Sequence, residues 1–140
     1  TEGVLYAEIV IEENIESNVN ISLSAGVHQR NLVKLIYLPS TNELKAEVYN
    51  SVGVNTVITY SNLTLGQYNK ISTSYNSTIL KLYVNGTQVG STSMNGLPSV
   101  LDRLSFDRAD NVANFFGKTK CVAVWKEALS DSELQSLTTI

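Results

Sequence analysis

Apolar and polar residues alternate with a period of two along several stretches of the chain. This pattern predicts strands with one face on a core and the other toward solvent. The clearest alternation falls in residues 5–11, 19–24, 44–49 and 80–85. In the third stretch every second residue is Leu, Ala or Val, and Tyr49 lies between them on the polar side. We therefore expect half-buried antiparallel strands, with Tyr49 on an outer face.

Turn signals separate the predicted strands at intervals of about ten residues, which is the rhythm of a sandwich or barrel. The sharpest signal is Asn85-Gly86. Both residues tolerate a positive φ, as the type I′ turn of a tight hairpin requires. We expect this turn to join a strand that ends near Val84 to one that begins near Gln88.

One helix is predicted, over residues 130–137 at the end of the chain. Ser130 suits the N-cap, and Glu133 stands three residues later, where it completes a capping box. Leu134 and Leu137 would face the sheets, and Trp125 is expected to pack beside this helix.

The fold class that follows is all-β, with two antiparallel sheets packed as a sandwich and one short C-terminal helix. The strands expected at the centre of the core are residues 68–75, 79–85 and 118–125. The side chains expected to be buried in them are Ile71, Leu82, Val84, Val122 and Val124. No repeat, linker or low-complexity tract divides the sequence, so we expect one domain over residues 1–140.

Composition and charge exclude several classes of partner. Ten Lys and Arg against thirteen Asp and Glu give a net charge of -3, and the basic residues form no run. We therefore expect no nucleic-acid partner. No apolar run approaches the roughly 20 residues of a membrane helix, so we expect no membrane insertion. Residues 1–20 lack the pattern of a signal peptide, and Cys121 has no second cysteine to pair with.

Three segments of the second half carry motifs in a characteristic order. They are GQYNKI followed by Tyr75 in residues 66–75, LKLYVNG followed by VGS in residues 80–91, and FG, VAVW and ALSDSEL in residues 116–134. In this order they resemble the laminin-G and pentraxin branch of the concanavalin A-like lectin and glucanase superfamily. The resemblance implies a jelly-roll sandwich, but it is weak for function because one fold hosts many activities.

The amino-acid sequence of the last part of the chain also resembles domains appended to bacteriophage tail and structural proteins. The resemblance lies in residues 103–107, 115–118 and 128–131. This resemblance implies a place on a virion or an extracellular surface. It also implies neighbouring structural protein chains as partners.

Catalytic residues of the glucanase type are missing from the sequence. Glucanases of the superfamily carry paired carboxylates in a Glu-x-Asp-x-Glu arrangement, because glycoside cleavage needs an acid and a nucleophile or base. The nearest pairs are Glu8 with Glu12 and Glu43 with Glu47, and each pair is better interpreted as solvated strand charges. His28 is the only histidine and has no nucleophile beside it in a known motif. We therefore expect no enzyme.

Residues 107–114 hold the densest cluster of oxygen ligands in the chain, with Asp107, Asp110, Asn111 and Asn114. Calcium takes six to eight such oxygens, so Asp107 and Asp110 are candidate metal ligands. The alternative, which we prefer, is a turn held by Asx hydrogen bonds and an Asp–Arg pair. The same carboxylate and amide groups are candidates for hydrogen bonds to sugar hydroxyls.

Tyrosine outnumbers the other aromatic residues, with seven against three Phe and one Trp. A tyrosine ring packs on the apolar face of a pyranose, and its hydroxyl shares hydrogen bonds. Tyr49 is the candidate exposed aromatic for such a role.

We expect a carbohydrate-binding or host-surface-recognition module, of the kind appended to a phage tail or other virion protein, whose partner is a glycan or cell-surface polysaccharide. The rival is a structural domain that decorates an assembly and contacts only protein. A glycoside hydrolase is the third and weakest alternative.

Overall fold

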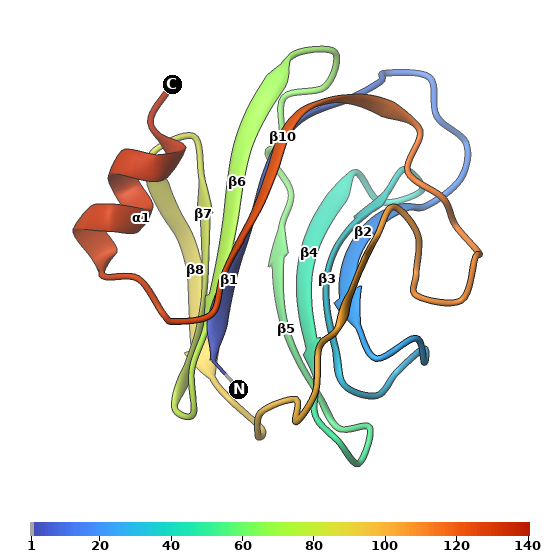
Figure 1. The fold of residues 1–140 in the computed structure, drawn as a ribbon. Helices are drawn as coiled ribbons and strands as arrows, with labels where there is room; N and C mark the ends of the chain where they lie inside the picture. Colours follow the sequence, from blue (N-terminus) through green and yellow to red (C-terminus); the bar gives the residue numbers. More distant parts are fainter. Residues whose placement is uncertain (1) are drawn as a thin grey trace.

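Two antiparallel sheets of five strands each pack face to face (Figure 1). The computed structural model describes residues 2–140. In spatial order, sheet A consists of β10 (Gly117–Trp125), β1 (Gly3–Ile11), β6 (Tyr68–Tyr75), β7 (Ile79–Val84) and β8 (Thr87–Ser93). Sheet B consists of β5 (Asn55–Tyr60), β4 (Glu43–Tyr49), β3 (Leu32–Leu38), β2 (Val19–Ser24) and β9 (Arg103–Ser105). The predicted all-β sandwich is confirmed.

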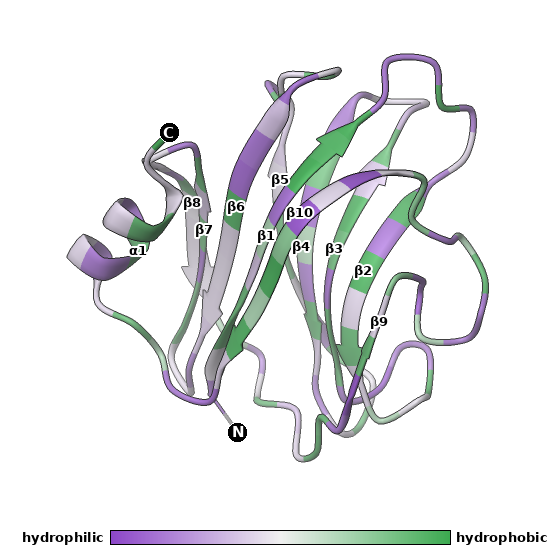
Figure 2. Cartoon of the chain, turned by 45° about the horizontal axis from the view of Figure 1, so that its top comes forward, coloured by the Kyte–Doolittle hydropathy of each residue, from purple (hydrophilic) through white to green (hydrophobic). Residues whose placement is uncertain are grey.

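The core fills the space between the sheets with the inward half of each alternating strand. Along β2, Val19, Ile21 and Leu23 belong to the core cluster, and the residues between them face outward. Figure 2 shows this alternation along β2. In sheet A, Ile71, Leu82 and Val84 are buried in the same cluster, as the sequence predicts.

Strand β10 lies at the edge of sheet A, where it pairs with β1. The prediction that it is central to the core is therefore wrong. Val122 is only half-buried, and Val124 keeps 43% of its surface exposed. Period-two alternation shows which face of a strand is apolar, but it does not show where the strand stands in the sheet.

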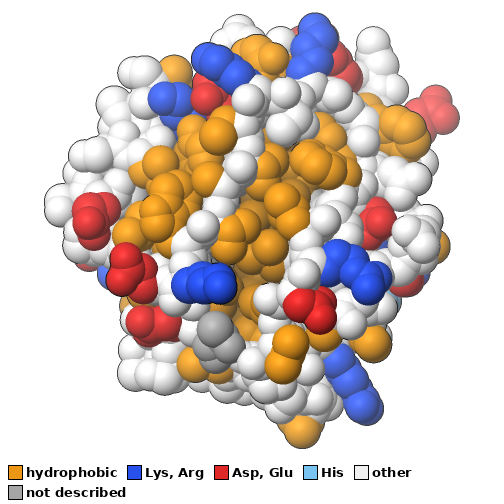
Figure 3. Space-filling view, viewed as in Figure 1, with side chains coloured by type: hydrophobic (Ala, Val, Ile, Leu, Met, Phe, Trp, Pro, Cys, Tyr) orange, Lys and Arg blue, Asp and Glu red, His pale blue; other side chains and the backbone are white. Residues whose placement is uncertain are grey.

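The two edge strands β10 and β9 leave one side of the sandwich open. Figure 3 shows hydrophobic side chains gathered at the centre of this face. The large apolar residues exposed there include Val100, Leu104 and Val124. The shortness of β9, which has 3 residues, and the lysines Lys118 and Lys120 of β10 are features that discourage pairing with other chains.

The turn between β7 and β8 has the predicted geometry. Asn85 has a φ of 50° and Gly86 a φ of 83°, so both central residues lie in the left-handed region. The Asn85 side chain also accepts a hydrogen bond from the backbone N–H of Lys70 at 2.9 Å. This bond ties the turn to the neighbouring strand β6.

Replacement of Gly86 by valine is expected to lower the free energy of unfolding by about 1–2 kcal/mol. A β-branched residue is strained at this positive φ, and the new Cβ would lie 3.2 Å from Thr139 Oγ1. Urea denaturation measures the change. Thr87→Val, at an exposed position next in the chain, is the matched control and should stay within about 0.5 kcal/mol of the parent. A Gly86→Val variant as stable as the control would contradict this account of the turn.

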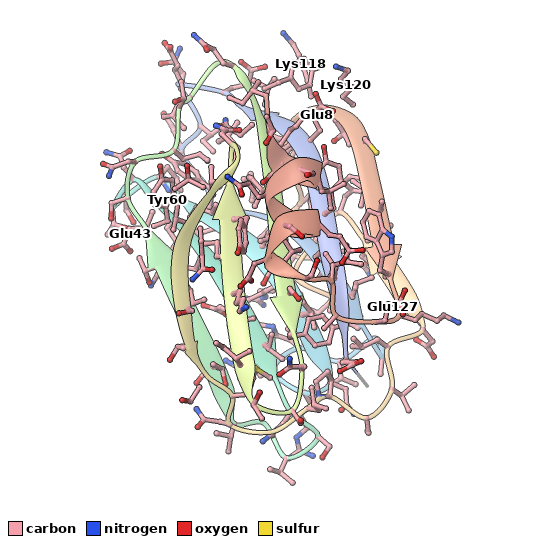
Figure 4. The ribbon with its side chains drawn as sticks, turned by 90° about the vertical axis from the view of Figure 1, so that its left-hand side faces the viewer. Glu8, Glu43, Tyr60, Lys118, Lys120 and Glu127 are labelled. Carbon is pink, nitrogen blue, oxygen red and sulfur yellow. The ribbon has the colours of Figure 1, made fainter. Side chains whose placement is uncertain are left out.

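Helix α1 (Asp131–Thr138) covers the outer face of sheet A (Figures 1 and 4). Ser130 is the N-cap and forms a capping box with Glu133, as predicted. Leu134 is fully buried against Val4 and Tyr83, and Trp125 packs on the same cluster. Within residues 2–140 no helix is long and apolar enough to cross a membrane. Helix α1 contacts β6, β7 and β8, so it covers this part of the outer face of sheet A.

Candidate functional site: the outer face of sheet B and the β9–β10 loop

The loop that joins β9 to β10, residues 106–116, lies against the outer face of sheet B. Ala109 packs in a buried cluster with Leu32 of β3 and Tyr49 of β4. Asn20 of β2 donates a hydrogen bond from its side-chain nitrogen to the carbonyl of Ala113 at 3.0 Å. The contacts therefore extend over three strands, and we call residues 106–116 the β9–β10 loop.

Tyr49 and this loop were separate candidates in the sequence, and the structure brings them together. Tyr49 faces outward, as the alternation predicts, but it is only 9% exposed because Ala109 lies against it. The expectation of an exposed ring is therefore wrong. Burial, followed by the nearby Glu47 carboxylate, raises the pKa of Tyr49. Lys34 Nζ lies 5.7 Å from the centre of the ring, within range of a cation–π interaction.

An ion pair lies beside Tyr49 on the same face. Lys34 and Glu47 are opposite each other in the β3–β4 register, and Lys34 Nζ is 2.9 Å from Glu47 Oε2. The two side chains are only 5% and 13% exposed. When two ions are removed from water in this way, each relies on the other for stabilisation, and the loss of either one leaves a costly unpaired charge. Sequence analysis did not single out Lys34.

A second charge pair belongs to the loop itself. Arg108 donates to Asp110 from Nη2 at 2.8 Å and from Nε at 3.2 Å. This bidentate contact lowers the pKa of the Asp110 carboxyl group. His28 lies nearby, and burial, followed by the charges of Arg108 and Lys34, lowers the pKa of its imidazole. The lowered pKa favours the neutral form of His28.

Several buried polar atoms near the loop lack a hydrogen-bond partner within residues 2–140. They are Asn20 Oδ1, Ser22 Oγ and His28 Nδ1. A buried polar atom without a partner costs about 1–3 kcal/mol, so such atoms mark places for ordered water. Asn20 and Ser22 lie side by side on the outer face of β2.

The loop backbone is unusually constrained. Ala109, Asn111 and Ala113 have φ values of 83°, 60° and 54°. Alanine rarely adopts a positive φ, and such residues cluster at ligand sites, where the surrounding contacts hold them. The Phe115 N–H donates to the Phe106 carbonyl at 2.8 Å and closes the loop at its base.

The predicted metal ligands Asp107 and Asp110 are both engaged in protein contacts. Asp107 Oδ1 accepts a hydrogen bond from the Ala109 N–H at 2.6 Å, which is an Asx turn, and Asp110 holds Arg108. Among residues 2–140, no group of three or more His, Cys, Asp or Glu side chains is placed to hold a metal. This arrangement matches the preferred turn interpretation, and calcium binding stays a prediction.

The other two predicted residues, Asn111 and Asn114, are exposed on the loop. Asn114 lines a cleft at the end of the sandwich. This end cleft is formed by residues 16–18 before β2, residues 39–40 after β3 and residues 112–114 and 116 of the loop.

A model of the family described as the concanavalin A-like lectin/glucanases superfamily, Laminin_G_3, matches residues 13–135. The chain belongs to this superfamily. The laminin-G resemblance expected from the motifs is thereby confirmed.

Several solved structures resemble this chain. One is the CBM40 of the Ruminococcus gnavus IT-sialidase bound to α2,3-sialyllactose, which has a TM-score of 0.78 and 17% sequence identity. The match covers 99% of this chain and 83% of that chain. The leech intramolecular trans-sialidase gives a TM-score of 0.73 at 15% identity, with 100% and 23% of the two chains covered. The SAP-like pentraxin of Limulus polyphemus gives 0.67 at 14% identity, with 97% and 69% covered. These likenesses show the fold. A search of the curated proteins finds no match.

The four glutamates considered for glucanase chemistry are each paired with a lysine. Glu8 lies 3.1 Å from Lys120 and Glu12 lies 3.9 Å from Lys118. Glu43 lies 3.7 Å from Lys45, and Glu47 pairs with Lys34. Figure 4 shows Glu8 beside the two lysines of β10 and Glu43 apart from them, beside Tyr60. The interpretation preferred from the sequence is solvated strand charges, and it describes Glu12 and Glu43. It is wrong for Glu8 and Glu47, whose side chains are only 12% and 13% exposed.

Proposed function

We propose that this chain is a non-catalytic carbohydrate-binding module. Its glycan binds on the outer face of sheet B, beside the β9–β10 loop. The observation that carries the proposal is the concentration of polar groups on this one face. Two ion pairs, a histidine and three buried polar atoms without partners among the described residues lie around a constrained loop.

The charges of the face suit an acidic sugar. Arg108 is a partly accessible cation, with 35% of its side chain exposed. Asp110 occupies the edge of the guanidinium group formed by Nε and Nη2, so a ligand carboxylate would bind the remaining N–H groups of Nη1 and Nη2. The CBM40 structures of similar fold are described with α2,3- and α2,6-sialyllactose, each of which contains a carboxylate. We therefore propose sialylated glycans as the first ligand class to test, on a virion or another extracellular surface.

Binding of 3′-sialyllactose, measured by calorimetry, tests the proposal. We expect the parent chain to bind and Arg108→Gln to weaken binding about tenfold, the loss of a charge-assisted hydrogen bond. Lys118→Gln is the matched control, because Lys118 is an exposed cation on sheet A. Melting temperatures verify that both variants fold. No sialic acid should be released during the measurement.

Three results would contradict the proposal. The first is that the parent binds neither sialyllactose nor any glycan on an array. The second is that Arg108→Gln binds sialyllactose as tightly as the parent does. The third is that free sugar is released.

The alternative is a structural domain that contacts only protein in an assembly. The open side between β9 and β10, with exposed Leu104 and Val124, favours it. A chain that binds no glycan but co-purifies with a neighbouring protein, and loses that partner on Val124→Asp, would support this alternative.

A further inference from the structure

The end cleft contains the most exposed aromatic ring of the β9–β10 loop. Phe116 keeps 63% of its surface exposed, and Val112 on the opposite arm of the loop is exposed as well. Large apolar side chains that stand together on a surface mark binding sites more often than chance. A ring left in water gains free energy when an apolar surface covers it.

Polar side chains surround this ring. Ser17, Asn18, Ser40 and Asn114 line the same cleft and are exposed. They offer hydroxyl and amide groups that both donate and accept hydrogen bonds. An aromatic platform bordered by such groups matches the two surfaces of a pyranose, whose C–H face is apolar and whose hydroxyls project from the ring edge.

The charge of the cleft restricts which sugar it takes. Glu16 is the one ionisable side chain among its lining residues, and no lysine or arginine lines it. A carboxylate-bearing sugar would meet a like charge there, whereas a neutral sugar would not. The cleft thus differs from the outer face of sheet B, where the guanidinium group of Arg108 is partly exposed.

The cleft adjoins that face and is held in shape by the same loop. The bond from Asn20 to the Ala113 carbonyl anchors the loop between the two sites, and the Phe115 N–H bond to Phe106 closes it. Phe116 and Asn114 are therefore preorganised, which lowers the entropic cost of binding.

We propose that the end cleft is a second sugar subsite that takes a neutral hexopyranose. The sugar stacks on Phe116 and bonds through its hydroxyls to Asn18 and Asn114. This inference rests on the proposed glycan-binding function, but it concerns a different set of residues.

Titrations of the ¹⁵N-labelled chain with lactose, maltose and mannobiose test the inference. The expected result is amide shifts at Asn18, Asn114 and Phe116 with at least one of these neutral disaccharides. Phe116→Ala should weaken that binding about three- to tenfold, the loss of one stacking contact. Tyr68→Ala is the matched control, because Tyr68 is an exposed ring on sheet A outside the cleft. Asn114→Ala is the second variant and should also weaken binding.

A parallel titration with 3′-sialyllactose separates this inference from the proposed function. Shifts at Lys34, Tyr49 and His28, with none in the end cleft for any of the four sugars, would overturn the second subsite and leave the proposed function intact. Neutral-sugar shifts in the end cleft, with none on the outer face of sheet B, would support the subsite and overturn the proposed site. No shifts with any sugar would overturn both. Equal affinities for Phe116→Ala and the parent would overturn the subsite alone.

Discussion

Replacement of Leu82 by alanine is expected to lower the free energy of unfolding by about 2–5 kcal/mol. Leu82 lies in β7, in the interior of sheet A, and is fully buried in the core between the sheets. The smaller side chain removes buried apolar surface and leaves a cavity that the surrounding strands fill only in part. Urea denaturation, with the slope of the transition compared between variants, measures the loss.

Val124→Ala on the edge strand β10 is the control for this prediction. Val124 is already 43% exposed, so its truncation should cost less than about 1 kcal/mol. A Leu82→Ala variant that loses no more than the control would show that β7 does not contribute to the core in the way described.

Replacement of Lys34 by methionine is expected to destabilise the fold by about 3–5 kcal/mol. The substitution keeps the length of the side chain but removes the ammonium group that lies 2.9 Å from Glu47 Oε2. Glu47 is then a charge with little access to water and no cationic partner, which is the costly way to break a buried ion pair. Denaturation at neutral pH measures the effect.

The double variant Lys34→Met with Glu47→Leu should recover most of the lost stability, because no unpaired charge remains. Lys118→Met is the matched control on an exposed pair, whose side chains are 68% and 45% exposed. It should change stability by less than about 1 kcal/mol. A Lys34→Met loss as small as that of the control, or a double variant no more stable than Lys34→Met, would mean that water screens this pair after all.

Local signals in the sequence predict the local elements well. The alternation along β2 and the cap residues Ser130 and Glu133 act within a few residues, so the strand and the helix start are both predictable. The edge position of β10 is not predictable in this way. It depends on which strand pairs with β1, a contact between residues more than 100 positions apart, such as Ala7 and Val122.

The candidate site is predictable only in part for the same reason. The sequence indicates Tyr49 and residues 107–114, but their contact through Ala109 depends on how the loop folds back over sheet B. Two further signals in the sequence predict parts of this site. Residues 39–42 are Pro-Ser-Thr-Asn, a typical turn composition. In a hairpin centred on this turn, Lys34 stands opposite Glu47, which predicts the ion pair. The consecutive Phe115 and Phe116 cannot both face the core of an extended segment, which predicts one exposed ring.

The position of helix α1 affects how the domain can be displayed. The first described strand β1 belongs to sheet A, and α1 brings the other chain end to the outer side of the same sheet (Figure 1). A chain anchored to a bead or particle by its C-terminal end therefore keeps its sheet B face turned away from the support. Several copies on one support would meet a surface coated with repeated sugars at a high effective concentration, so weak contacts at each copy would add up to firm attachment.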